Sequence, residues 1–113
     1  MPLVDLLKVA RDRFQSNLQV VNSTLGDQPI YIQPARESLR AVFSTALTTI
    51  FASDLQPIVG SAGSVGERLA RLAVAHGRQQ PAIHTVFPDP VDRDEVLKVT
   101  LAALQAAFTK VLS

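Results

Sequence analysis

The most regular stretch of the sequence reads LRAVFSTALTTIF, from Leu39 to Phe51. Its apolar side chains return every three or four residues, at Leu39, Val42, Phe43, Ala46, Leu47, Ile50 and Phe51. This interval gathers them on one face of an α-helix, whereas a half-buried strand alternates every second residue. We expect the helix to begin at Pro34 and to end before Pro57, because an interior proline lacks the N–H donor and its ring crowds the preceding turn. The stretch therefore predicts an amphipathic helix and an all-α fold class.

Apolar residues with the same period predict three more helices. The first covers residues 2–25 and is framed by a proline in its first turn and a glycine after its last. The next begins with the capping box Ser64-Val65-Gly66-Glu67 and stops at Gly77. The last begins at Asp92 and continues to the C-terminus. All 113 residues are thus predicted to form one domain, a compact bundle of four amphipathic helices.

The helix predicted from Asp92 has the widest apolar face of the four. Beside its main apolar row it carries a second row at Val96, Ala103 and Ala107. A helix that is apolar round so much of its circumference is either central in its own fold or binds another chain. We favour binding, and predict that Val96, Ala103 and Ala107 form the interface of a homo-oligomer.

Three segments that begin with Gln-Pro leave a second fold open. Each continues into a short apolar stretch and is followed by a predicted helix: QPIYI from Gln28, QPIV from Gln56 and QPAIHTVF from Gln80. This order is typical of successive β–α units, so the alternative is a small α/β domain with three short parallel strands. Because central parallel strands do not readily accommodate proline, we favour the all-α fold, in which these segments are joints between helices.

The composition limits the partners. Eleven Lys and Arg against ten Asp and Glu give a net charge of +1, and the basic residues are scattered, so no concentrated basic face for nucleic acid is predicted. The chain has no cysteine, which excludes disulfides, thiolate metal sites and a Cys nucleophile. Asp5 stands where a secretory signal would be basic, and the longest apolar run, residues 41–52, is interrupted by Ser and Thr. We expect a cytoplasmic protein that binds neither nucleic acid nor a membrane.

A glycine-rich segment, GSAGSVG, is the one candidate binding motif. Its candidate phosphate-binding residues are Gly60, Ser61, Gly63, Ser64 and Gly66. The segment resembles the phosphate-binding turn of dinucleotide-binding dehydrogenases, in which a strand runs into G-x-x-G-x-x-G and then a helix. The resemblance implies a phosphate held by backbone N–H groups, with Asp89 near the place of the ribose-binding acid. The alternative, which we favour, is a flexible linker that ends in the capping box of Ser64 and Glu67.

No catalytic or metal-binding group emerges from the remaining residues. His76 and His84 lie eight positions apart and belong to no HxxxH or HxxE pattern that could hold a metal. The acidic residues Asp89, Asp92, Asp94 and Glu95 suit the dipole of the helix that follows them. We therefore predict no metal, no cofactor and no nucleophile.

The preferred function is a non-enzymatic protein–protein interaction or assembly module. A mean hydropathy of +0.19 with 19% charged residues leaves little polar surface for so small a body, so part of its apolar surface should meet a partner. We predict self-association through the helix from Asp92, together with binding of another protein. The alternative function is a small phosphate- or nucleotide-binding α/β domain that uses the Gly60–Gly66 turn.

Overall fold

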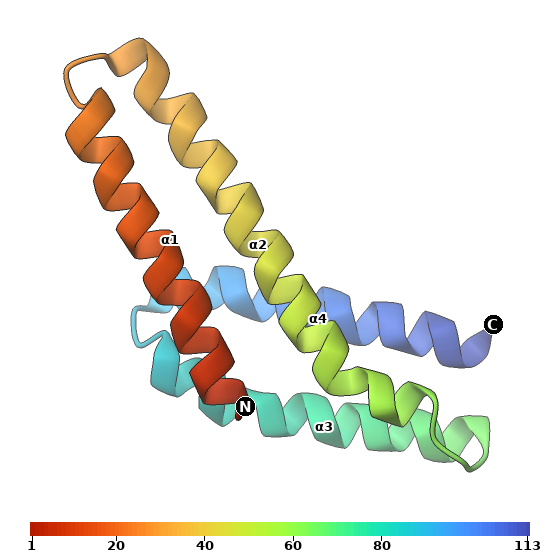
Figure 1. Cartoon of the computed structure of the whole chain (residues 1–113). Helices are drawn as coiled ribbons and strands as arrows, with labels where there is room; N and C mark the ends of the chain where they lie inside the picture. The colour runs from red at the N-terminus through yellow and green to blue at the C-terminus, as the bar shows by residue number, and fades with distance from the viewer.

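The computed structural model describes residues 1–113 and contains four helices and no strand. These helices are α1 (Leu3–Leu25), α2 (Pro29–Val59), α3 (Val65–Val86) and α4 (Pro90–Leu112), shown in Figure 1. The predicted all-α fold is confirmed. The α/β alternative is wrong, because the apolar residues after each Gln-Pro pair are helical.

The Gln-Pro segments are parts of helices and not separate joints. Pro29 is the first residue of α2, where proline's missing N–H has no partner to lose, so α2 begins five residues earlier than predicted. Pro34 and Pro57 both lie inside α2, close enough to its ends that each removes only one backbone hydrogen bond near a terminus. The predicted boundaries at Pro34 and Pro57 are therefore wrong.

α3 also continues past Gly77, where it was predicted to stop, and past Pro81. The carbonyl that Pro81 leaves without a donor belongs to the residue four positions earlier, which is Gly77, and glycine is the residue whose backbone adjusts most freely. The continuation buries Ala82, Ile83 and Val86, which are only 8%, 0% and 1% exposed. Tertiary burial therefore outweighs the local cost of the proline.

The four helices form two helical hairpins that cross each other (Figure 1). Every pair of helices packs together except α1 and α4. The molecule is elongated, with dimensions of 57 × 27 × 23 Å. One end of the α1–α2 hairpin extends beyond α3 and α4, and no residue between Ala10 and Leu47 is buried. We call residues 11–46 the arm.

The core consists of two apolar clusters that lie one after the other along the crossing helices. The larger cluster is built around Leu7, Phe51 and Ile83, and the smaller one around Leu55, Leu72 and Leu104. α2 contributes to both clusters, since Phe51 belongs to the first and Leu55 to the second. α2 therefore holds the two parts of the core together.

A polar layer connects three helices through Asp54 of α2, Gln79 of α3 and Thr100 of α4, of which Gln79 and Thr100 are buried and Asp54 is exposed. The Thr100 hydroxyl donates to Gln79 Oε1 at 2.8 Å, and Gln79 Nε2 donates to Asp54 Oδ2 at 2.8 Å. Gln79 and Thr100 are 1% and 0% exposed. Five other helical threonines donate instead to the carbonyl four residues earlier in their own helix: Thr45, Thr48, Thr49, Thr85 and Thr109. Thr100 thus donates its hydroxyl to another helix, whereas these five threonines donate within their own helix.

The substitution Thr100→Val tests the polar layer. It leaves Gln79 Oε1 buried without a donor, so we expect the free energy of unfolding, measured by urea titration, to fall by about 1–3 kcal/mol. The double variant Thr100→Val/Gln79→Met leaves no buried polar atom of the layer unpaired, since Asp54 is exposed, and should recover most of that loss. The control, Thr109→Val, changes an exposed threonine on the same helix and should shift stability by less than about 0.5 kcal/mol. If the double variant instead lost as much stability as Thr100→Val and Gln79→Met lose separately, added together, the two side chains would not interact.

Candidate functional site

The three residues predicted to form an interface, Val96, Ala103 and Ala107, lie inside the folded chain. They are 1%, 4% and 6% exposed. Val96 and Ala103 belong to the larger core cluster and Ala107 to the smaller one. α4 packs against both α2 and α3, and its wide apolar face serves these two neighbours. The wide apolar face of α4 is therefore explained by a central position in the fold, the possibility that the sequence analysis did not favour.

The glycine-rich turn connects α2 to α3 and is held by its own side chains. Ser64 caps α3, since its Oγ accepts from the Glu67 N–H at 3.1 Å. The Ser64 hydroxyl in turn lies 3.1 Å from Glu67 Oε1 and donates to it, so the carboxylate bonds the side chain of Ser64 and not its backbone N–H. Glu67 thereby brings a negative charge to the helix end where a phosphate would bind.

Arg71, one helical turn after Glu67 on α3, also bonds the residues of this turn. Its Nη1 donates to Ser61 Oγ and to the Ala62 carbonyl, both at 2.8 Å, and its Nη2 lies 3.4 Å from Glu67 Oε2. Gly63 has φ +120°, and a Cβ there would lie 2.6 Å from Arg71 Nη2. Gly60 ends α2, and Gly66 lies in the first turn of α3 with free space around it. This geometry favours a structural turn, in which the predicted phosphate residues bond one another.

The histidines and the acidic cluster are not brought together. His76 is half-buried on α3 and its Nδ1 is enclosed without a hydrogen-bond partner, whereas His84 is exposed in the last turn. No three His, Asp or Glu side chains converge on a point where they could hold a metal ion. Asp89 caps α4, because its Oδ1 accepts from the backbone N–H groups of Val91 and Asp92 at 2.8 and 3.2 Å.

An apolar groove runs along the seam between α1 and α2, and the sequence analysis did not find it. Its volume is about 410 Å³. Twelve residues line it, nine of them hydrophobic: Leu6, Val9, Ala10, Arg13, Phe14 and Asn17 from α1, and Leu39, Val42, Phe43, Ala46, Thr49 and Ile50 from α2. Arg13 is the one charged residue in this set. The groove begins at the base of the arm and extends onto it.

Two contacts fix how α1 and α2 are aligned along the groove. Phe14 stacks on Phe43 with ring centroids 4.7 Å apart and planes 14° apart. Nearer the tip, Arg36 Nε and Nη2 both donate to Asn22 Oδ1, at 3.0 and 2.7 Å. In each pair the two residue numbers add to about the same value, as expected for antiparallel helices in a constant register.

This register places two small side chains, Ala10 and Ala46, level with each other in the groove. Their size keeps that part of the floor low. Val9 and Val42 stand on the two rims with 44% and 65% of their surface exposed. The Thr49 hydroxyl donates to the Thr45 carbonyl, so Thr49 adds a methyl group to the groove and no free donor. The groove therefore has the shape and chemistry of a helix-packing surface without its partner.

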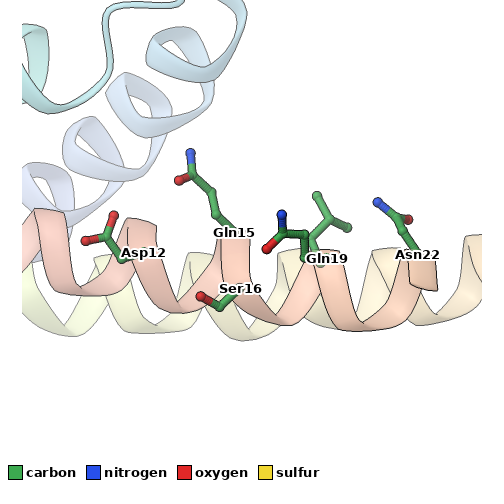
Figure 2. Close-up of a pocket in the computed structure, with 6 residues that line it drawn as sticks. Asp12, Gln15, Ser16, Gln19 and Asn22 are labelled. Atoms are coloured by element: carbon green, nitrogen blue, oxygen red, sulfur yellow. The ribbon is translucent and has the colours of Figure 1, made fainter. Parts of the chain in front are cut away.

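The opposite side of α1 carries a polar hollow of about 470 Å³. Figure 2 shows Asp12, Gln15, Ser16, Gln19 and Asn22 along one helix, and Leu18 completes the lining. Asp12 pairs with Arg11 at 3.0 Å, and the Asn22 amide oxygen already accepts from Arg36. A hollow lined by a single helix, with one charge that is already paired, is a solvated face. The arm therefore has one polar side and one apolar side.

α2 is also long and apolar enough to cross a membrane, by length and composition. An 18-residue window of it has a mean hydropathy of 1.2 and at most two charged residues, and 17% of that window is buried. The sequence analysis missed this because it considered uninterrupted apolar runs only. The buried part is the row of Leu47, Phe51 and Leu55, which faces the core.

Comparison of the chain with models of protein families, with curated proteins and with solved structures found no match. The candidate site therefore rests on geometry alone. Of the features described, the groove between α1 and α2 is the one with apolar lining, exposed rims and no partner within the chain.

The turn between α2 and α3 yields a matched pair of glycine substitutions. Gly63→Ala forces a side chain onto a backbone with φ +120° and against Arg71, so we expect a loss of about 1–3 kcal/mol in the free energy of unfolding. Gly66→Ala places a Cβ in open space within a helix and should stabilise the protein by about 0.5–1 kcal/mol. Both changes are measured by urea denaturation. Equal effects at the two positions would contradict a turn held by Arg71 and Glu67.

Proposed function

We propose that this chain is a non-enzymatic interaction module that self-associates, and that it does so through the arm and not through the buried row of α4. The observation that carries the proposal is an excess of surface. The chain exposes 7054 Å², whereas a compact monomer of 12.2 kDa exposes about 6,100 Å². The excess is about 950 Å².

This excess is close to what an association would cover. A standard protein interface removes about 800 Å² from each partner. The radius of gyration, 16.5 Å, likewise exceeds the roughly 13 Å of a compact chain of this length. The arm contributes to both differences, since none of the 17 buried residues lies in it. A second chain packed along the arm would bring both quantities towards those of a compact protein.

The chemistry of the groove supports a protein partner. Its lining is mostly apolar with a single charged side chain, Arg13, which is the pattern of the core of an interface, where charged residues are depleted. The arm tip adds further exposed apolar side chains, Val20 at 62% and Tyr31 at 55%. Tyrosine is enriched at interfaces because it buries a large ring and keeps a polar hydroxyl.

We place the module in the cytoplasm and assign it protein partners, with no cofactor, nucleic acid or membrane. The most apolar helix, α2, uses its row of Leu47, Phe51 and Leu55 within the core, and it carries Arg36, Glu37 and Arg40 in its first half. Its C-terminal half carries Asp54, which accepts a hydrogen bond from Gln79, and a carboxylate there would be costly in a bilayer. The net charge of +1 adds no attraction for nucleic acid.

The proposal is tested by measuring solution mass across a wide range of protein concentration. We expect the mass to rise from that of one chain to that of two. Val42→Asp places a carboxylate on the groove rim and should raise the dissociation constant at least roughly thirtyfold, equivalent to about 2 kcal/mol. Val74→Asp is the matched control, because Val74 is also exposed (54%) but lies on α3, and its mass profile should stay unchanged.

Circular dichroism of each variant keeps this test separate from unfolding. Both aspartate variants should remain as helical as the parent, since Val42 and Val74 are exposed in the single chain. A parent protein that stays at the mass of one chain throughout, or that floats with phospholipid vesicles instead of pairing, would overturn the proposed function.

A further inference from the structure

The groove contains both halves of a self-complementary contact. Val42 lines it with 65% of its surface exposed, and one helical turn away, about 6 Å along α2, the groove is lined by the small side chains of Ala46 and Ala10, which we take as its hollow. A two-fold symmetric interface uses the same patch on both copies, so the patch must offer a projection and a recess that can exchange places. Val42 and the hollow satisfy that requirement.

Building on the proposed self-association, we infer that the occupant of the groove is a second copy of this chain. The two arms pair antiparallel about a two-fold axis, and Val42 of each copy enters the hollow between Ala10 and Ala46 of the other. Four helices, two from each copy, then form an intermolecular bundle. The surface excess of about 950 Å² per chain is large enough to supply such an interface.

The polar groups of the groove fit a helix face better than a small ligand. A ligand pocket directs several polar groups at its contents. Here the Thr49 hydroxyl is committed to its own helix, and Asn17 and Arg13 remain. Arg13 can lay its aliphatic stem on the apolar floor while its guanidinium reaches solvent. The remaining lining is aliphatic and aromatic, as in the seam of a helical bundle.

Arg13 is nevertheless the feature that opposes closure of the groove. Its guanidinium has no salt-bridge partner in the chain, and covering the groove removes part of its hydration. Replacing it with leucine removes this cost and adds apolar contact. An apolar side chain at this position should therefore strengthen pairing, a result that loss of folding cannot imitate.

The first experiment maps the contact with engineered cysteines, which is clean because the chain has none of its own. Val42→Cys and Ala46→Cys are prepared separately, mixed in equal amounts and oxidised mildly. The mixture should form a disulfide-linked dimer in greater yield than either variant alone, since the pairing brings residue 42 of one copy to residue 46 of the other. Val74→Cys and Leu101→Cys are the controls: both residues are exposed, on α3 and α4.

The second experiment compares Arg13→Leu with Arg40→Leu. Both variants lose one positive charge from an exposed arginine of the arm, but Arg40 does not line the groove. We expect the dissociation constant of the dimer, from sedimentation equilibrium, to fall by roughly tenfold for Arg13→Leu and to change little for Arg40→Leu.

The outcomes separate this inference from the proposed function. A chain that dimerises by mass, but whose Leu101→Cys variant cross-links while the 42 and 46 mixture does not, associates through α4. The proposed self-association then stands, whereas its assignment to the arm and the groove pairing are both overturned. A weaker dimer for Arg13→Leu would also overturn the groove pairing. If no dimer forms at any concentration, both the proposed self-association and the groove pairing are overturned. Cross-linking of the mixture together with tighter binding by Arg13→Leu supports both.

Discussion

The burial of one row of α2, formed by Leu47, Phe51 and Leu55, is the contact on which the rest of the molecule depends. These side chains are 2%, 0% and 0% exposed and stand four residues apart. The row passes through both core clusters, so α1, α3 and α4 all pack against the helix that carries it. Asp54, next to Leu55, joins this helix to the polar layer. The row covers only the C-terminal half of α2. In the N-terminal half Phe43 still contacts Phe87, and no residue of α2 before Leu47 is buried.

Periodicity was sufficient to predict the four helices, but it could not predict where they end. The rule that proline stops a helix is local, whereas α3 gains the burial of Ile83 and Val86 by continuing past Pro81. The width of an apolar face was equally ambiguous, because the row of α4 that contains Ala103 could belong to a core or to an interface. Only the packing of α2 and α3 against α4 shows that it belongs to the core. Polar residues such as Gln79 give no sign in the sequence that they will be buried.

The groove between α1 and α2 could not be predicted from the sequence, because it depends on how two helices are packed. Val9 and Val42, on its rims, come from different helices, and whether they line one groove depends on how α1 and α2 rotate about their axes. That rotation is set by contacts such as the Phe14–Phe43 stack, which no single-helix pattern encodes.

The glycine-rich turn between α2 and α3 is the opposite case, because the sequence predicted a possible site that the structure does not favour. Its composition suggested a phosphate ligand, whereas in the structure the side chains of Glu67 and Arg71 bond the residues of the turn.

The unburied arm also determines how the protein should unfold. Backbone hydrogen bonds that are protected only by one neighbouring helix open at a lower free energy than those inside a core. Amide hydrogens near the loop of Gly26 and Asp27 should therefore exchange with solvent through local fraying, while those around Phe51 and Ile83 exchange only when the whole molecule opens. The chain thus combines a cooperative body with a hairpin end of low intrinsic stability, whose ordering depends on what packs against it.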